Sequence, residues 1–263
     1  MVLGSGVAAI NASILAFVKA GDHVLMVDCA YGPARRFCDA FLKRFGVDVT
    51  YFDPWIGSNI DKLFRDTTRV VYVEAPGSQT FEMQDIARVS ALARPKGILT
   101  LADNTWGAGY LYKPLDHGAD ISLQALTKYV GGHSDVFMGS VAAASPAMIA
   151  ALERQIVDLG WAVAGDDAYQ MLRGLRTLPT RMARHQASAL TVAAWLAAQP
   201  EIVRVLYPAL PGDPGHALWK RDYTGAAGLF SVVMRPGPQA AVPAFLDALT
   251  LFGLGFSWGG HES

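Results

Sequence analysis

The chain has 263 residues, 52% of them hydrophobic, and its 22 Lys and Arg residues are nearly balanced by 23 Asp and Glu residues. A formal net charge of -1 provides no basic field for nucleic acid or for an anionic membrane surface, and no apolar run is long enough to span a bilayer. The lack of a basic field favours a protein that acts on a small molecule. Because Cys29 and Cys38 are too few for a secreted disulfide framework or a metal site, we expect the protein to be cytoplasmic.

Up to Gly165, short β-branched apolar runs alternate with helical patterns, which is typical of a mostly parallel sheet with helices on both faces. Along the chain, strands are expected at His23 to Asp28, Val47 to Asp53, Arg69 to Ala75, Ile98 to Asp103, Ile121 to Ala125 and Val136 to Ala143. Helices are expected at Asn11 to Lys19, Pro33 to Phe45, Ile60 to Phe64, Met83 to Arg94 and Pro146 to Val157. The pattern predicts an α/β fold.

Beyond Gly165 the pattern changes to two long helices and then to a smaller α+β domain. The helices are expected at Asp166 to Thr177 and Leu178 to Gln199, followed by strands at Gly228 to Met234 and near Phe252 to Trp258, with a helix at Gln239 to Leu249. This predicts a large domain over residues 1–177 and a linking helix with a small domain over residues 178–263. Both ends look cut, so the chain is expected to be a fragment.

Polar groups follow several of the expected strands, at Asp28, Glu74, Asp103 and the Thr127–Lys128 pair. In an open α/β sheet, ligands bind at the carboxyl ends of the strands, so these groups are expected to gather there. At the start of the chain, the stretch from Gly4 to Ala9 opens a helix whose backbone N–H groups could hold a phosphate. Close packing of a small-residue helix start against a strand is the alternative interpretation.

Lys128 and Asp103 together suit pyridoxal phosphate. A lysine forms a Schiff base with the aldehyde of that cofactor, and an aspartate keeps its pyridine nitrogen protonated so that the ring accepts electrons from a carbanion. Lys128 lies in the run Leu126 to Asp135, where it is followed by two glycines, Gly131 and Gly132. A lysine in this setting favours catalysis over a solvated surface position.

Several segments of the chain resemble the Cys/Met-metabolism family of pyridoxal-phosphate enzymes, which has the aspartate aminotransferase (fold-type I) fold. The matching segments are Ala30 to Pro33, Tyr51 to Gly57, Glu74 to Ser78, Asp103 to Trp106, Thr127 to Asp135, Arg173 to Leu178, Pro208 to Gly212, His216 to Asp222 and Ser257 to Ser263. Within the family, the segments after Pro208 and around Trp258 resemble the branch that cleaves the Cβ–sulfur bond of cystathionine.

The resemblance implies a role for each of eight residues. It makes Lys128 the Schiff-base lysine and the catalytic base, and Asp103 the partner of the pyridine nitrogen. The other implied contacts are Tyr31 with the cofactor ring and the substrate, Gly6, Val7 and Thr127 with the phosphate, Ser257 with the substrate carboxylate, and Trp258 with the wall of the substrate pocket. Ala125 stands where many relatives have a serine near the phosphate, which leaves more of that contact to Thr127.

The activity implied by the resemblance is a carbon–sulfur β-lyase of methionine biosynthesis and transsulfuration that converts L-cystathionine to homocysteine, pyruvate and ammonia. Two alternatives remain: a γ-lyase or γ-synthase of the same family, and a catalytically silent truncated fragment. The resemblance also implies a homodimer or homotetramer. In the family that the chain resembles, a tyrosine and an arginine from a neighbouring subunit complete the phosphate site, and an arginine nearer the C-terminus binds the substrate carboxylate.

Overall fold

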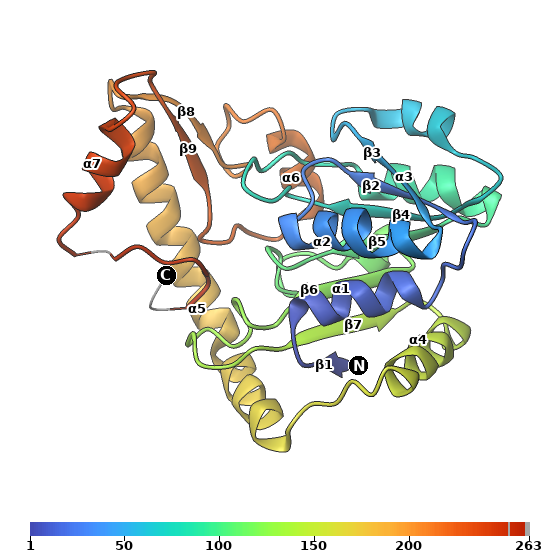
Figure 1. The fold of residues 1–263 in the computed structure, drawn as a ribbon. Helices are drawn as coiled ribbons and strands as arrows, with labels where there is room; N and C mark the ends of the chain where they lie inside the picture. Colours follow the sequence, from blue (N-terminus) through green and yellow to red (C-terminus); the bar gives the residue numbers. More distant parts are fainter. Residues whose placement is uncertain (252, 261–263) are drawn as a thin grey trace.

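The computed structural model describes residues 1–251 and 253–260, and within them a large sheet carries helices on both faces (Figure 1). The sheet has seven strands in the order β1-β7-β6-β5-β4-β2-β3. Its parallel strands are β2 (His23–Val27), β3 (Asp48–Phe52), β4 (Thr68–Glu74), β5 (Leu99–Asp103) and β6 (Ile121–Ala125). At one edge, β7 (Gly139–Ala143) and β1 (Val2–Leu3) continue the sheet in antiparallel pairing. The expected α/β fold with a mostly parallel sheet is confirmed.

The strands at the centre of the sheet are mostly apolar because helices cover both faces. All five residues of β2 are buried, including His23. The His23 ring is satisfied by hydrogen bonds of 2.8 Å between Nδ1 and Thr68 Oγ1 and 3.0 Å between Nε2 and Thr50 Oγ1. This polar residue therefore fits the core without an unpaired ring nitrogen.

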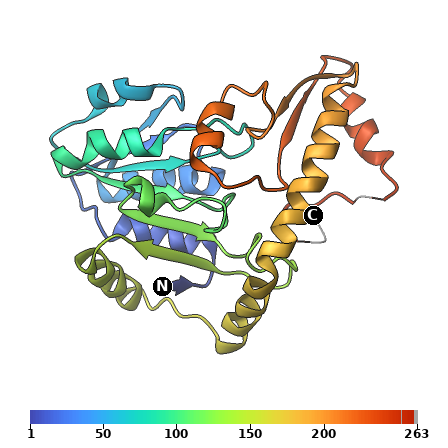
Figure 2. The ribbon, with the colours of Figure 1, turned by 180° about the vertical axis from the view of Figure 1, so that it is seen from behind.

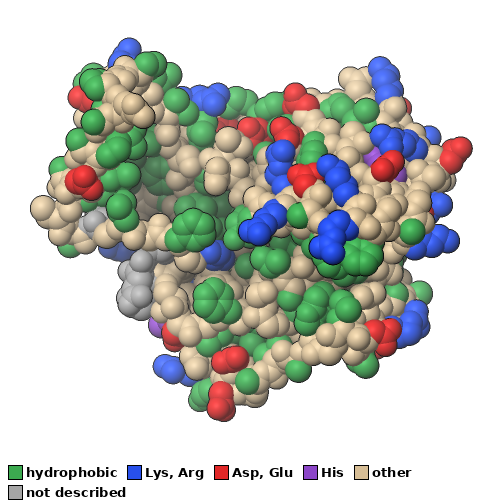
Figure 3. Space-filling view, in the orientation of Figure 1, with side chains coloured by type: hydrophobic (Ala, Val, Ile, Leu, Met, Phe, Trp, Pro, Cys, Tyr) green, Lys and Arg blue, Asp and Glu red, His purple; other side chains and the backbone are tan. Residues whose placement is uncertain are grey.

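Helices α1 (Gly6–Leu15) and α2 (Gly32–Arg36) lie on one face of the sheet, and α3 (Ile86–Ala93) lies on the other (Figures 1 and 2). A π turn at Phe37–Phe41 and a 3₁₀ turn at Leu42–Phe45 continue α2, so the helix expected over this region is confirmed in a modified form. Further 3₁₀ turns lie at Gly57–Leu63, Arg94–Lys96 and Pro114–His117, and α4 (Pro146–Asp158) lies beyond β7. On the face seen in Figure 3, acidic and basic side chains are interspersed.

The long helix α5 (Gly165–Ala197) corrects the sequence-based prediction of two helices that meet at residues 177 and 178. Pro179 lies inside it and lacks the N–H that a helix interior normally uses. Side chains stabilise the preceding turn, because Thr177 Oγ1 and Arg181 Nη2 donate to the Gly174 carbonyl at 3.1 and 2.8 Å. The helix therefore continues through the proline. It is the longest helix described, yet no described helix is both long and apolar enough to cross a membrane.

The C-terminal part contains β8 (Ile202–Leu206), α6 (His216–Asp222), β9 (Ser231–Met234) and α7 (Ala241–Asp247). Strands β8 and β9 pair in antiparallel fashion, as a small α+β unit requires. The last strand, expected near Phe252 to Trp258, is not found, because residues 253–258 form no strand. Phe252 and residues 261–263 lie outside the described residues. Gly259 has a φ of +86°, which turns this segment out of an extended path.

Candidate active site

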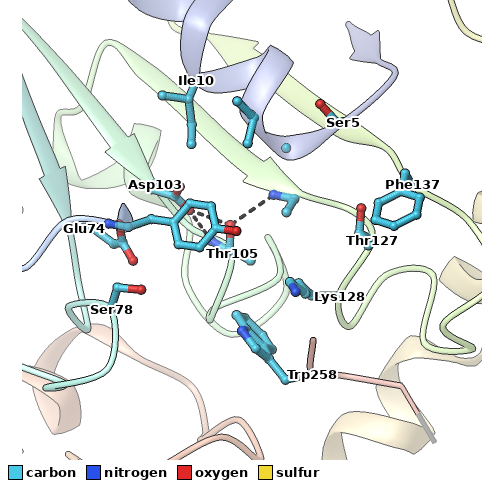
Figure 4. A pocket seen from close by; sticks show the side chains of 14 residues that line it. Ser5, Ile10, Glu74, Ser78, Asp103, Thr105, Thr127, Lys128, Phe137 and Trp258 are labelled. Carbon is cyan, nitrogen blue, oxygen red and sulfur yellow. Dashed lines mark hydrogen bonds between the residues drawn. The ribbon is translucent and has the colours of Figure 1, made fainter. Parts of the chain in front are cut away.

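A cavity of about 290 Å³ lies where β4, β5 and β6 end, beside the N-terminus of α1. Figure 4 shows Thr127 and Lys128 across the cavity from Glu74 and Ser78. Its walls come from segments far apart in the sequence: Ser5, Gly6, Val7, Ile10, Tyr31, Glu74, Ser78, Asp103, Thr105, Ala125, Thr127, Lys128, Phe137 and Trp258. The carboxyl ends of parallel strands meet at one edge of the sheet, which explains how these segments converge.

The N-terminus of α1 provides hydrogen-bond donors at one end of the cavity. Ser5 caps the helix: its Oγ accepts from the Ala8 N–H at 3.0 Å, and its carbonyl accepts from Ala9 at 3.1 Å. The N–H groups of Gly6 and Val7 have no recorded acceptor among the described residues, as expected for the first turn of a helix. Together with the positive end of the helix dipole, they form a site suited to a phosphate.

Gly6 is required by close packing at this helix start. A Cβ added to Gly6 would lie 2.6 Å from the Cβ of Ala125 on β6. The two interpretations of the Gly4 to Ala9 stretch, phosphate site and close helix–strand packing, are therefore compatible. Because Ala125 and Gly6 are small, α1 can pack closely against the end of β6.

Lys128 reaches the cavity from the loop after β6. Its Nζ donates a hydrogen bond of 2.6 Å to Ser257 Oγ and lies 5.1 Å from the centre of the Trp258 ring. Burial lowers the pKa of the Lys128 ammonium from its usual range. The direction agrees with the expectation for a lysine that acts as a base.

The segment that carries Ser257 and Trp258 passes directly over the backbone of Lys128. A Cβ on Gly259 would lie 2.8 Å from the Lys128 carbonyl carbon, and one on Gly260 would lie 2.1 Å from Ser134 Oγ. Only glycine accommodates the first contact together with the positive φ of Gly259. Trp258 also packs against Tyr129, with ring centres 5.2 Å apart.

Asp103 ends β5 and is 6% exposed. Its Oδ1 accepts hydrogen bonds from Thr105 N at 2.9 Å and Thr105 Oγ1 at 2.6 Å, and its Oδ2 accepts from Tyr72 Oη at 3.1 Å. Burial raises the pKa of Asp103, whereas these three hydrogen bonds oppose the rise. The carboxylate is thus held in one orientation beside the cavity.

Thr127 reaches the cavity, but its hydroxyl already has partners. Thr127 Oγ1 donates to the Met138 carbonyl at 3.2 Å and accepts from Met138 N at 3.0 Å. The strand expected from Val136 begins only at Gly139, and Met138 just before it pairs with both the backbone and the side chain of Thr127. A phosphate contact from this hydroxyl requires its proton to turn away from Met138.

Seven of the eight residues assigned a role by resemblance line the cavity, and the eighth, Ser257, contacts Lys128. Asp28 does not join them: it lies outside this cavity with 58% of its side chain exposed, paired with Arg35, which corrects the expected gathering of all strand-end carboxylates. Thr105 and Tyr72 were missed as supports of Asp103. Thr105 falls inside the Asp103 to Trp106 segment, so proximity in sequence was an available signal, whereas Tyr72 is recognisable only from strand register.

The donor set fits the cofactor that the sequence implies. Unpaired N–H groups at a helix N-terminus suit a phosphate, a fixed carboxylate suits a pyridine nitrogen, and an amine with a lowered pKa suits an aldehyde. These three kinds of group line one cavity together with Tyr31.

Comparison with known proteins gives matches along the whole chain. The family model described as Cys/Met metabolism PLP-dependent enzyme matches residues 1–263. A curated protein of Rhizobium johnstonii is 53% identical over 98% of this chain, and the cystathionine β-lyase of Bordetella avium is 48% identical over 98% of it. The chain spans 66% and 65% of the lengths of these two proteins.

A solved structure has the same architecture. The cystathionine γ-lyase of Lactobacillus plantarum, complexed with L-serine, superposes with a TM-score of 0.95 at 31% identity. The superposition covers 99% of this chain and 68% of that one.

Proposed function

The chain belongs to the Cys/Met metabolism PLP-dependent enzyme family, and from that premise we propose that its complete gene product is a carbon–sulfur β-lyase. The proposed reaction converts L-cystathionine and water to homocysteine, pyruvate and ammonia. The observation that carries the proposal is the convergence of Lys128, Asp103 and the α1 N-terminus on one cavity, in a chain 48% identical to a cystathionine β-lyase.

In this proposal, each part of the cavity holds one part of pyridoxal phosphate. The N–H groups of Gly6 and Val7 and the Thr127 hydroxyl bind the phosphate, the Tyr31 ring covers the cofactor ring, and Asp103 faces the pyridine nitrogen. The hydrogen bonds from Thr105 and Tyr72 to Asp103 support that role, because they fix a carboxylate that would otherwise rotate.

When bound, pyridoxal phosphate supplies a protonated ring that accepts the electron pair left on Cα after proton removal. Lys128 Nζ takes that proton. Because the pKa of Lys128 is lowered, a larger fraction of its amine is unprotonated near neutral pH and can act as a base. Asp103 retains the proton on the ring nitrogen. Ser257 accepts a hydrogen bond from Lys128 Nζ and is also the proposed partner of the substrate carboxylate.

A second cavity of about 260 Å³ adjoins the first and supports a place for the rest of the substrate. It shares Tyr31, Lys128 and Trp258 with the first cavity and extends to Leu229 and Ser231 near β9. We propose that the sulfur-bearing arm of cystathionine lies here, with Trp258 as an aromatic wall.

We further propose a homodimer or homotetramer, supported by exposed apolar side chains on the first half of α5: Tyr169, Leu172 and Leu175. The free thiols of Cys29 and Cys38 support a reducing, cytoplasmic location. The division into residues 1–177 and 178–263 also stays a proposal, with α5 now running across its boundary.

The γ-lyase alternative is supported by the L. plantarum structure, and the direct test is product analysis with L-cystathionine. β-Elimination releases homocysteine, whereas γ-elimination releases cysteine. The complete gene product is expected to give homocysteine and pyruvate. Cysteine as the main thiol product would replace the proposal with γ-elimination.

The silent-fragment alternative is tested by colour. We expect a visible absorption band after incubation with pyridoxal phosphate. In the Lys128→Ala variant this band should be lost and activity should fall by about 10²- to 10⁴-fold. Lys113→Ala, which changes an exposed lysine outside the cavity, is the control and should keep both. If this chain stays colourless while the complete gene product takes up the cofactor, the chain is a silent fragment, whereas a complete gene product that also stays colourless would contradict the enzyme proposal.

A further inference from the structure

Glu74 is a second carboxyl group in the cavity wall, and neither the sequence nor the proposed mechanism assigns it a role. It ends β4, where it is the register partner of Asp103 on the neighbouring parallel strand. It also lines both cavities described above. Two carboxyl groups at adjacent strand ends therefore face one ligand site.

Glu74 is tied to the backbone that carries Tyr31. Its Oε2 accepts a hydrogen bond of 2.8 Å from the Tyr31 N–H. Glu74 itself is anchored by Gln84, whose Oε1 accepts from the Glu74 N–H at 3.1 Å and whose Nε2 donates to the Glu74 carbonyl at 2.8 Å. The position of Tyr31 at the cavity thus depends directly on the Glu74 carboxyl group.

The two carboxyl groups have unequal surroundings. Within residues 1–251 and 253–260, no Lys, Arg or His forms an ion pair with Glu74 or Asp103. Asp103 receives three hydrogen bonds from Thr105 and Tyr72, whereas the Glu74 carboxyl receives one from the Tyr31 N–H and one from Ser78. Like charges at adjacent sites with little solvent cannot both ionise cheaply, so Asp103, which receives the larger number of hydrogen bonds, keeps the charge.

Lys128 is the only cationic side chain that lines the same two cavities as Glu74, and within the described residues it forms no ion pair with Glu74. The groups that face Glu74 are Cys29 and Tyr31 after β2, Tyr72 on β4, Ser78 after β4, Asp103 on β5 and, across the cavity, Lys128. Burial and the Asp103 charge raise the pKa of Glu74 well above its usual range, although hydrogen bonds from Tyr31 and Ser78 oppose the rise. The direction agrees with the geometry.

We propose that Glu74 is a positioning residue: as a neutral carboxylic acid it fixes the Tyr31 backbone over the cofactor site without placing a second negative charge beside Asp103. This proposal rests on the proposed function, because it assigns Asp103 to the pyridine nitrogen. A second anion at this edge would compete with Asp103 for the ring proton. A neutral acid keeps the hydrogen bond to Tyr31 and avoids that competition.

The first test uses infrared difference spectra of the complete gene product without cofactor, at neutral pH. Wild type minus Glu74→Gln should show the carbonyl band of one protonated carboxylic acid. The matched control is Asp28→Asn, which changes the exposed carboxylate after β2 and should show no such band. Absence of the acid band from wild type minus Glu74→Gln would overturn the proposal, whatever the activity of the enzyme.

The second test uses the cofactor-loaded protein. Glu74→Gln keeps a neutral acceptor for the Tyr31 N–H, so the pH midpoint of the visible band should stay that of wild type. Glu74→Ala removes the acceptor, and cofactor affinity should fall by about threefold to tenfold. A shifted midpoint in Glu74→Gln would show that Glu74 carries charge and would overturn the proposal. A colourless wild type would instead contradict the proposed function, so the two failures are distinguishable.

Discussion

Two regions of the cavity are built in different ways. The strand ends supply Asp103 and Glu74, whose backbones are fixed by the ladders of a buried sheet. The opposite wall is the irregular segment of residues 253–260, which carries Ser257 and Trp258. Of the residues in this segment, only Gly259 is buried, and it lies against the Lys128 backbone.

The sheet fixes the orientation of a charged group, whereas the irregular segment is held in place by packing. Strand register sets the spacing of Asp103 from its neighbours, and buried hydrogen bonds fix its carboxylate orientation. The segment is positioned by a few close contacts, above all at Gly259. We therefore expect changes at the strand ends to affect the chemistry and changes in the segment to affect positioning.

The largest effect is expected from Asp103→Asn, which keeps the shape of the strand end but removes its charge. The variant should lower kcat/KM for cystathionine by about 10²- to 10³-fold, the range for loss of one preorganised electrostatic group. Steady-state kinetics on the folded variant would measure it. The matched control is Asp28→Asn, at the end of β2 but outside the cavity, which should stay near wild type. Near-wild-type activity in Asp103→Asn would contradict the expectation that changes at the strand ends affect the chemistry more than changes in residues 253–260 do.

A smaller effect is expected from Gly259→Ala. The added Cβ meets the Lys128 backbone, and the positive φ costs a non-glycine residue about 1 to 2 kcal/mol, so kcat/KM should fall roughly tenfold while the fold persists. Gly253→Ala is the control in the same segment, because a Cβ there meets no atom of the described residues within 4 Å. Kinetics and circular dichroism on both variants would check this. Equal behaviour of the two would show that close contact at Gly259 does not position the segment.

The smallest effect is expected from Ser257→Ala, which removes the acceptor for Lys128 Nζ. Loss of one hydrogen bond of this kind costs about 0.5 to 1.5 kcal/mol, so kcat/KM should fall by roughly twofold to tenfold. The hydrogen bond favours the ammonium form, so its loss should lower the pKa of Lys128 further and move the acid limb of the pH–rate profile to lower pH. Ser257→Thr should restore both. An acid limb that moves to higher pH in Ser257→Ala would contradict this account.

The stability of the strand-end region is expected to depend on pH through Glu74. A carboxyl group whose pKa is raised by folding contributes stability below its unfolded pKa of about 4.3, and loses that contribution as pH rises through its folded pKa. Wild type should therefore lose stability relative to Glu74→Gln as pH rises above about 4. Urea unfolding of both proteins across this range measures the difference. A difference that stays constant with pH would place Glu74 among ordinary ionised carboxylates.

Sequence reasoning succeeds where local pattern and position in the sheet coincide. Asp103 ends one strand, and Thr127 and Lys128 follow another, in a repeated strand–helix pattern that makes their positions predictable. The division into two helices expected between residues 177 and 178 is wrong, because the hydrogen bonds from Thr177 and Arg181 to the Gly174 carbonyl form only in the folded helix and leave no local pattern.

Other features depend on contacts that no local pattern records. The support that Tyr72 gives Asp103 is set by register between β4 and β5. Residues 253–258 form no strand, and Gly259 just after them lies against the Lys128 backbone, which is far away in the sequence. Asp28 ends a strand as Asp103 does, but its side chain is drawn to Arg35 instead of the cavity.

The most direct test of the central assignment is to find which side chain binds the cofactor covalently. The complete gene product would be incubated with pyridoxal phosphate, reduced with borohydride, digested and examined by mass spectrometry. We predict that the phosphopyridoxyl label is on Lys128 and is absent from Lys128→Ala. A label on another lysine, with Lys128 unmodified, would contradict the account of this cavity.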